Sequence, residues 1–367
     1  MTVLPVDDGH PGFDAGRLAR VSDLLDIAAK DGMYPGAVAV VAHRGRVVYQ
    51  HAAGRQQDGP EPRVKMPLDA VFDLASVTKP VAGTALLLMI EDGLLTLDDY
   101  VVDHVPEFQG RDKGAVRIRH LVSHTSGVAS NPKLYHEHKS WERLRSAYLT
   151  LPLIGVPGSL FLYSSINFIL LTLIVERVSG RALDVLLRER VFGPLGMTDT
   201  MFNPPEALRP RIPATEYVDW RGSYDWGVVN DKTAQLMGGV SAHAGLFSSA
   251  QDLALFGHML LSGGRYGDAR VLSPAAAKLF LSGWPDERGA SRGVCWLPGN
   301  RRTFGDLVGG HSFGHTGTTG TAMCLVPADD LVVVLLTNRV HPTRSNDLIE
   351  KFRPRFFNAV AAARTGN

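Results

Sequence analysis

The stretch DLASVTKPVAG, residues 73–83, places Ser76 three residues ahead of Lys79, just before the apolar run TALLLMI. A serine hydroxyl is a weak nucleophile at neutral pH and needs a base within hydrogen-bond reach. Residues at i and i+3 share one face of a helix, so a helix that begins near Ser76 brings the amine of Lys79 close to the hydroxyl. The stretch therefore predicts a serine nucleophile with a lysine partner at the start of an apolar helix.

The composition is that of an ordinary globular protein: 367 residues, 45% hydrophobic and 20% charged, with a formal net charge of +1. At about 150 residues per domain, this length predicts roughly two domains. The sequence contains no long basic run of the kind that would indicate nucleic-acid binding. The longest apolar runs, 168–175 and 331–336, are far shorter than the ~20 residues of a membrane span. The N-terminus lacks the basic and apolar regions of a signal peptide, so we expect a cytoplasmic protein unless a leader was removed.

Strand patterns occur at both ends of the chain. Residues 14–31 read as an amphipathic helix capped by Asp14, and 36–54 read as a β-hairpin. Residues 313–339 indicate two strands around the turn PADD, followed by a helix near 345–364. These segments predict an antiparallel sheet flanked by terminal helices.

The middle of the chain is different. Helical patterns dominate from residue 76 to about 190, whereas 203–239 is rich in Pro, Gly, Trp and Tyr and looks irregular. We therefore predict an α+β protein with two domains and the active site between them. One is a discontinuous sheet domain, 1–75 with 240–367, and the other is a mainly helical domain, 76–239.

Two further stretches carry side chains that suit acyl transfer. Tyr163 precedes the strongly apolar run NFILLTLIV, and its phenol could exchange a proton with Ser76 if the ammonium of Lys79 lay nearby. FGHTGTTG, residues 313–320, reads as a strand where glycine lets a ligand approach the backbone. The N–H groups of Thr318 and Ser76 would then form an oxyanion hole. Taken singly, the tyrosine could merely pack, and the glycine-rich stretch could be an ordinary edge strand.

Together, and in this order along the chain, these motifs resemble the serine β-lactamase and penicillin-binding-protein superfamily. The chain is most similar to the branch of class C β-lactamases, D-alanyl-D-alanine carboxypeptidases and family VIII esterases. Further signatures of that branch are IRHLVSHTSGV (118–128), AGLFSSAQDLALFGHMLLSGG (244–264) and VVVLLTNRVHPTR (332–344). The resemblance extends from about residue 15 to 360 and implies a β-lactamase-like fold.

The resemblance implies an acyl-enzyme mechanism on a small acyl substrate, without a cofactor. Ser76 would attack a carbonyl, and Lys79 and Tyr163 would share the general-base and general-acid roles, in an order that stays open. His315 would hydrogen-bond Tyr163 or a substrate carboxylate, and Gly317 would leave room for the substrate. Water or an acceptor alcohol would release the acyl group.

Two positions depart from the pattern of that branch. Ser165 stands where the family's tyrosine motif usually has the asparagine that holds a substrate amide, and Asn167 is a nearby amide that could partly compensate. His315 stands where β-lactamases usually carry lysine, and histidine is mostly neutral at pH 7. Both departures favour an esterase or a carboxypeptidase over a β-lactamase. We expect His243 either to contact substrate or to be structural.

Several alternatives remain open at this point. They are a D-Ala-D-Ala carboxypeptidase or penicillin-binding protein, a weak β-lactamase, an acyltransferase, and a catalytically idle binding protein. No metal-ligand motif such as His-Glu-x-x-His is present, so we expect no metal site. Nor is there a G-x-S-x-G elbow or a G-x-G-x-x-G loop, which argues against an α/β-hydrolase or a dinucleotide enzyme.

Overall fold

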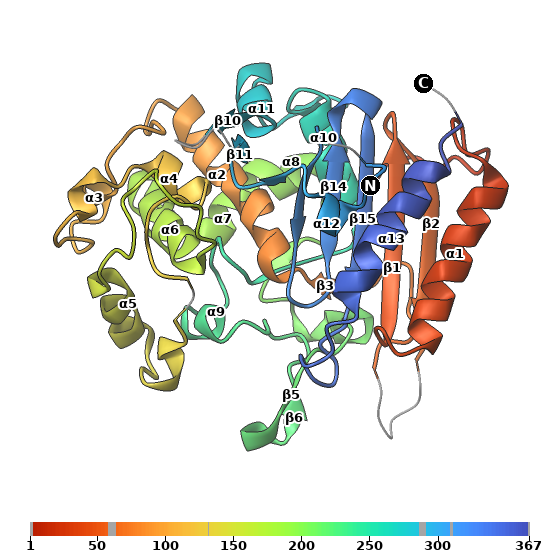
Figure 1. Cartoon of the computed structure of the whole chain (residues 1–367), viewed down its shortest axis with the longest axis horizontal. Helices are drawn as coiled ribbons and strands as arrows, with labels where there is room; N and C mark the ends of the chain where they lie inside the picture. Colours follow the sequence, from red (N-terminus) through yellow and green to blue (C-terminus); the bar gives the residue numbers. More distant parts are fainter. Residues whose placement is uncertain (1–2, 58–63, 131, 286–290, 309–310, 366–367) are drawn as a thin grey trace.

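The computed structural model describes residues 3–57, 64–130, 132–285, 291–308 and 311–365, and its largest sheet is six-stranded and antiparallel (Figure 1). The strand order is β12-β13-β14-β15-β1-β2, and every neighbouring pair is antiparallel. The strands are β1 (Gly36–His43), β2 (Arg46–Gly54), β12 (Leu297–Pro298), β13 (Phe313–Thr316), β14 (Ala322–Val326) and β15 (Leu331–Thr337). Both ends of the chain therefore build one sheet, as predicted.

Helices cover both faces of this sheet. α1 (Ala15–Lys30) and α13 (Ile349–Ala362) pack on one face, and α10 (Ala250–Leu261) packs on the other (Figure 1). Successive side chains of a strand point to opposite faces, and alternate residues of β1 accordingly enter two different core clusters. Every residue of β1 and β15 is buried as a result.

The predicted terminal elements are confirmed, with one correction. α1 begins after Asp14, whose Oδ1 accepts the Arg17 N–H at 2.7 Å. The two strands predicted around the turn PADD are β14 and β15, but the stretch 313–339 also contains a third strand, β13. The extra reversal is a tight turn in which the Gly317 N–H donates to the Thr321 carbonyl at 2.8 Å.

The region from residue 78 to 195 is helical, as predicted. Its elements are α2 (Thr78–Glu91), α3 (Val101–His104), α4 (Ile118–Val122), α5 (Trp141–Thr150), α6 (Ser165–Ser179), α7 (Leu183–Leu187), a π-helical turn (Arg188–Phe192) and α8 (Gly193–Leu195). α2 and α6 are apolar on nearly all sides, which is typical of helices enclosed by protein. They pack against each other, and the N-termini of both lie near the site described below.

Short elements connect the sheet with the helical region. β3 (Phe72–Asp73), β7 (Leu246–Ser248) and β4 (Met201–Phe202) form a small sheet in the order β3-β7-β4. Segment 203–239 is irregular, as predicted, and contains only short turns, β5 (Tyr217–Val218), β6 (Ser223–Tyr224) and α9 (Lys232–Leu236). The remaining elements are β8 (Arg265–Tyr266), β9 (Ala269–Arg270), α11 (Pro274–Phe280), β10 (Gly283–Pro285), β11 (Ser291–Gly293) and α12 (Arg301–Phe304).

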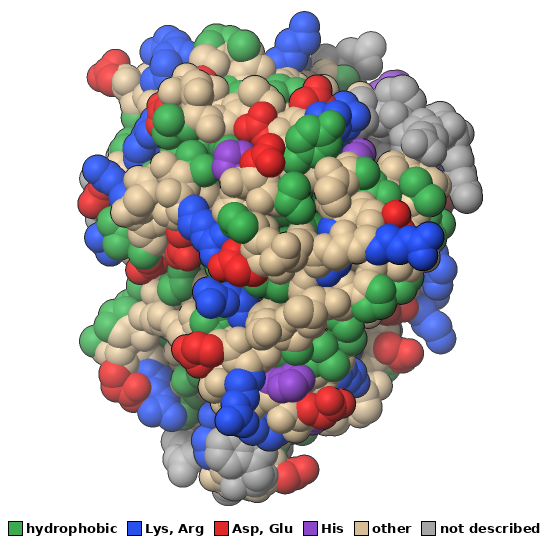
Figure 2. All heavy atoms as spheres, turned by 90° about the vertical axis from the view of Figure 1, so that its left-hand side faces the viewer, with side chains coloured by type: hydrophobic (Ala, Val, Ile, Leu, Met, Phe, Trp, Pro, Cys, Tyr) green, Lys and Arg blue, Asp and Glu red, His purple; other side chains and the backbone are tan. Residues whose placement is uncertain are grey.

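The surface agrees with a net charge near zero. On the face shown in Figure 2, basic and acidic side chains are interspersed among apolar and polar ones. Within the described ranges, no helix combines the length and the apolar character that a membrane crossing requires.

Candidate active site

The serine of the opening motif lies in a tight turn between β3 and α2. Ser76 is the middle residue of a 3₁₀ turn (Ala75–Val77) that runs directly into α2. Ala75 has a φ of 46°, a left-handed conformation that is uncommon for a residue with a Cβ atom. Asp73 supports this conformation, since its Oδ1 accepts the Ala75 N–H at 2.8 Å. The turn therefore presents Ser76 at the start of a buried helix, where backbone N–H groups lack helical partners.

The connection between β13 and β14 holds this turn from the sheet side. Thr319 Oγ1 donates to the Asp73 carbonyl and Thr321 Oγ1 donates to the Leu74 carbonyl, each at 2.8 Å. A Cβ added to Gly317 would lie 2.4 Å from the Leu74 carbonyl oxygen. Gly317 thus permits a close approach to the backbone just before Ser76, and Thr318, the next residue, lines the same hollow as Ser76.

Lys79 lies one helical turn after Ser76 and is fully buried. Its Nζ donates to Ser76 Oγ at 3.0 Å and to the carbonyl of His243 at 3.1 Å. The same Nζ lies 4.9 Å from the centroid of the Tyr163 ring. The structure therefore brings the amine to the serine hydroxyl, at the spacing that the sequence indicates.

Tyr163 lies in the loop just before α6. Its ring centroid is 4.4 Å from that of His124 and 6.0 Å from that of His315. Its backbone is held from the side, because Ser130 Oγ donates to the Tyr163 carbonyl at 2.7 Å. Tyr163 thus reaches the site from the helical region, whereas His315 reaches it from the sheet.

His124 and Asn167 lie behind Tyr163. The N–H of Ser164 donates to His124 Nδ1 at 3.1 Å, and Asn167 Nδ2 lies 3.3 Å from the same nitrogen. Asn167 is fully buried, and its Oδ1 accepts from Ser126 Oγ at 2.6 Å. Burial, followed by the positive charge of Lys79, holds the pKa of His124 well below its usual range. The structure therefore places Asn167 in a neutral polar cluster and not in the wall of the hollow beside Ser76.

His315 on β13 is buried and has one ring nitrogen without a partner. Its Nδ1 lies 2.9 Å from the Thr316 carbonyl oxygen, which can only accept, so Nδ1 carries the proton of the neutral ring. Its Nε2 has no hydrogen-bond partner among the described residues. Burial, followed by the charge of Lys79, lowers the pKa of His315 to about 3. At neutral pH His315 is therefore an uncharged acceptor in the wall of the site.

His243 and Ser165 line a different hollow, with a volume of ≈140 Å³. The ring of His243 is engaged on both sides, with Nδ1 2.7 Å from Ser241 Oγ and Nε2 3.0 Å from Asp231 Oδ1. Only its carbonyl reaches Lys79. The structure thus separates these two predicted substrate contacts from the hollow that contains Ser76.

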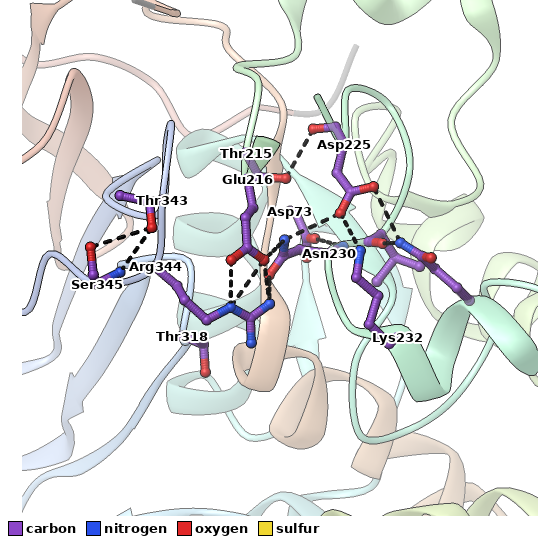
Figure 3. Close-up of polar contacts among 12 residues, drawn as sticks. Asp73, Thr215, Glu216, Asp225, Asn230, Lys232, Thr318, Thr343, Arg344 and Ser345 are labelled. Carbon is purple, nitrogen blue, oxygen red and sulfur yellow. Dashed lines mark hydrogen bonds and ion pairs between the residues drawn. The ribbon is translucent and has the colours of Figure 1, made fainter. Parts of the chain in front are cut away.

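A polar network behind Asp73 connects the Ser76 turn with loops that are distant in the sequence (Figure 3). Asp73 Oδ2 accepts the Asn230 N–H at 2.7 Å. Arg344 donates to Glu216 Oε1 at 2.8 Å and to Asn230 Oδ1 at 3.3 Å. Burial raises the pKa of Asp73 to about 6. The irregular segment is therefore bonded to the turn that presents Ser76.

The hollow beside Ser76 has a volume of ≈210 Å³. Its walls include four other predicted residues, Tyr163, His315, Gly317 and Thr318. They also include residues that sequence reasoning missed, among them Arg339 and Arg353. Arg339 Nε donates to the Thr318 carbonyl at 2.7 Å and Arg353 Nη2 to the Gly317 carbonyl at 2.9 Å. The same wall also contains the carboxylate of Glu350, so two guanidinium groups and one carboxylate lie near the serine.

The sequence marked these additional residues only weakly. Asp73 is the first residue of the opening stretch, but nothing local shows that its partner is Asn230. Arg353 is one of several basic residues in a C-terminal helix, and no spacing distinguishes it. Over the described part of the chain, no group of His, Cys, Asp and Glu residues is arranged to hold a metal ion.

Comparisons with known proteins agree with this geometry. A family model described as Beta-lactamase matches residues 21–353. A relative from Escherichia coli (strain K12), which carries the provisional name D-alanyl-D-alanine carboxypeptidase, is 33% identical over 369 residues. That match covers 90% of this chain and 84% of the relative.

Two solved structures are similar to this chain over nearly their whole length. EstCE1, described as a hydrolase with promiscuous acyltransferase activity, has a TM-score of 0.76 and 23% identity, covering 94% of this chain and 99% of its own. Unliganded simvastatin synthase (LovD) from Aspergillus terreus has a TM-score of 0.75 and 19% identity, covering 95% and 99%. At these identities the two structures bear on the fold alone.

Proposed function

This chain belongs to the beta-lactamase family of serine hydrolases, and we propose that within it the protein is a carboxylic-ester hydrolase that works through an acyl-enzyme on Ser76. The observation that carries the proposal is the 3.0 Å hydrogen bond from Lys79 Nζ to Ser76 Oγ. A nucleophile and its base within hydrogen-bond reach are the signature of covalent catalysis by serine. Tyr163 and Thr318, in the walls of the same hollow, supply the further groups that the reaction needs.

In the proposed reaction, Ser76 Oγ attacks the ester carbonyl carbon while its proton passes to Lys79 or Tyr163. The carbonyl oxygen, now carrying negative charge, accepts from the N–H groups of Ser76 and Thr318. The bond to the alcohol oxygen breaks, and Tyr163 gives that oxygen a proton. Water then adds to the acyl carbon, the bond to Ser76 Oγ breaks, and the acid leaves with the serine hydroxyl restored.

Two features of the site favour an ester over a β-lactam or peptide. Ser165 offers a short hydroxyl where a longer side-chain amide would be needed to bind a substrate amide. It also lines the ≈140 Å³ hollow and not the one that contains Ser76. His315 is neutral because its pKa is lowered to about 3, so it adds no charge to attract a carboxylate. An ester substrate requires neither contact.

One observation favours a second candidate, a D-Ala-D-Ala carboxypeptidase. Arg339 and Arg353 line the hollow beside Ser76 together with one carboxylate, Glu350, and the excess of guanidinium groups there would suit a substrate with a terminal carboxylate. The relative from Escherichia coli carries the name of that activity. The two candidates share the acyl-enzyme on Ser76 and differ in the group that leaves.

The intact mass of the protein after brief exposure to three acyl donors tests both candidates. The donors are p-nitrophenyl butyrate, benzylpenicillin and an acyl-D-alanyl-D-alanine thioester, and the proteins are wild type, Ser76→Ala and the control Ser262→Ala at an exposed serine. We expect a butyryl adduct or rapid ester consumption in wild type and the control, abolished in Ser76→Ala. A lasting penicillin adduct would favour the carboxypeptidase. Full ester turnover by Ser76→Ala would refute the acyl-enzyme.

A further inference from the structure

A second hollow adjoins the one beside Ser76, and the two share Tyr163 and Leu297 as walls. The second hollow is the larger, at ≈460 Å³ against ≈210 Å³. Beyond the shared walls it is lined by the aromatic rings of Phe161 and Trp296. A group bound against Tyr163 in the first hollow can therefore extend into the second without leaving the protein surface.

The two hollows differ in charge. Arg339, Arg353 and Glu350 line the first, so that hollow carries charges of both signs. The polar residues that line the second include Asn300 and His124, and His124 is neutral because burial and nearby positive charge hold its pKa well below the usual range. No carboxylate, ammonium or guanidinium belongs to the described residues that line the second hollow. An apolar group loses little by entering such a space, whereas a charged group would lose its hydration.

We infer that the second hollow, lined by Phe161, Trp296 and Leu297, binds the apolar alcohol portion of the ester. The inference rests on the proposed function. In that reaction the alcohol oxygen must come within hydrogen-bond reach of the Tyr163 hydroxyl to receive its proton. The carbon chain attached to this oxygen then lies next to Tyr163, and the second hollow begins there.

The dimensions suit an alcohol of several carbons or an aryl alcohol. An engineered protein cavity of about 150 Å³ binds benzene, and this hollow is about three times as large. Its walls are also tied to the rest of the protein. The N–H of Cys295, next to Trp296, donates to the Val122 carbonyl at 3.0 Å, and the Leu162 N–H donates to the His124 carbonyl at 2.8 Å. The hollow therefore exists before substrate binds.

The same hollow would select the alcohol in the reverse direction of the acylation step. An alcohol bound there attacks the acyl carbon of acylated Ser76, and its proton passes to Tyr163. The bond between the acyl carbon and Ser76 Oγ breaks, and that oxygen takes up the proton, so a new ester leaves. An apolar alcohol should therefore compete with water better than methanol does.

Two ester series test the inference. One keeps the acetyl group and varies the alcohol from methyl through butyl to benzyl; the other keeps the methyl alcohol and varies the acyl group from acetyl to hexanoyl. The proteins are wild type, Phe161→Ala in the second hollow, and Tyr135→Ala, a matched aromatic residue in the ≈140 Å³ hollow. In wild type we expect kcat/KM to rise by about fourfold for each methylene added to the alcohol. The increase in kcat/KM for each methylene should be less than twofold in Phe161→Ala and should remain about fourfold in Tyr135→Ala.

The outcomes separate the inference from the proposed function. Ser76-dependent release of p-nitrophenol from p-nitrophenyl acetate in each variant shows that its acylation site is intact. With that release present, an alcohol series that is flat in wild type, or unchanged by Phe161→Ala, overturns the inference alone. A preference for butanol over methanol as acyl acceptor, reduced in Phe161→Ala, supports it. Absence of any Ser76-dependent release in wild type overturns the proposed function, and the inference with it.

Discussion

The turn that carries Ser76 and the wall of the ≈460 Å³ hollow lie on two sides of Tyr163, and they are held in different ways. The turn is fixed by directional hydrogen bonds: the Asp73 carboxylate accepts a backbone N–H, and the hydroxyls of Thr319 and Thr321 donate to backbone carbonyls. The wall at Phe161 and Leu297 is apolar side-chain surface, which tolerates exchange for side chains of similar volume. The difference indicates that rate and selectivity can change separately: substitutions in the turn should lower kcat, and substitutions in the wall should change which alcohol is preferred.

The largest effect should come from the two groups that surround Ser76. Lys79→Met keeps most of the buried side-chain volume but removes the amine, and Tyr163→Phe removes only a hydroxyl. We expect each change to lower kcat for an aryl ester by about 10³-fold or more. When residues act as a unit, removing one of them loses most of the rate that the whole unit provides. The double variant should lose little beyond either single one. If the reduction in kcat of the double variant equalled the product of the two single reductions, the two groups would act independently.

The next effect tests whether hydrogen bonding of the turn sets the rate. In Asp73→Asn, one of the two N–H groups that the carboxylate accepts would meet an amide nitrogen, which cannot accept. We expect kcat to fall by about 10- to 100-fold with little change in KM. Asp252→Asn is the matched control, because Asp252 is also buried and also accepts a backbone N–H, from Asp199 at 2.9 Å. Equal losses of kcat in both variants would mean that Asp73 supports the fold in general and not Ser76.

Protonation of the same carboxylate should lower kcat at acid pH, which gives the profile of kcat against pH an acid limb. Burial, helped by the charges of Asp231 and Asp225 and opposed by its two N–H donors, raises the pKa of Asp73 to about 6. Below this pH the carboxyl carries a proton and loses an acceptor, so kcat should fall by about fivefold between pH 6 and 5. The pKa of Asp73 in the folded protein exceeds its ordinary value, so the folded state binds this proton more tightly than the unfolded state. Titration of Asp73 should therefore not lower the stability of the protein while kcat falls. The limb should be absent from Asp73→Asn and present in Asp252→Asn.

The sequence predicted those parts of the site that depend on local spacing. Ser76 and Lys79 are separated by one helical turn, so their contact follows from the helix alone. The bond between Asp73 and Asn230 joins residues 157 positions apart, and no pattern near either residue indicates it. The prediction of the fold shows the same difference. The helix α1 was predicted closely because its apolar residues recur with helical spacing, whereas the turn between β13 and β14 was missed because it interrupts a strand-like stretch.

The placement of His243 and Asn167 shows what residue type alone leaves open. Both are polar residues near motifs, and a sequence does not tell which hollow or which partner such a side chain faces. His243 lines the ≈140 Å³ hollow and pairs with Asp231, and Asn167 pairs with Ser126. Each partner lies on a segment that reaches its neighbour only through the tertiary fold. The polar residues of a motif are therefore a poor guide to which hollow they line.

A smaller effect on rate should follow from crowding of the turn. In Gly317→Ala the added Cβ would lie 2.2 Å from Thr321 Oγ1 and 2.4 Å from the Leu74 carbonyl oxygen, so the backbone must shift. We expect kcat to fall about fivefold and stability by about 1–3 kcal/mol, the usual cost of overpacking. Gly114→Ala is the control, since nothing lies within 4 Å of the Cβ added there. An unchanged kcat in Gly317→Ala would mean that Ser76 tolerates movement of the adjoining strand. That result would contradict the expectation that changes in the turn lower kcat.

The smallest effect concerns stability alone. Burial, followed by the charge of Lys79, lowers the pKa of His315 to about 3, whereas an unfolded histidine titrates near 6.5. Between these values the unfolded chain holds a proton that the folded chain lacks, so acidification should cost about 1.4 kcal/mol per pH unit. His315→Gln cannot take up that proton and should lose stability less steeply from pH 6.5 to 4.5 in denaturant titrations. Asp252→Asn should change the slope in the opposite sense, because burial raises the pKa of Asp252 to about 6 and its folded form takes up the proton first. Equal slopes in His315→Gln and wild type would mean that His315 takes up its proton in the fold as readily as in the unfolded chain, so that at acid pH β13 would carry a charge able to attract a substrate carboxylate.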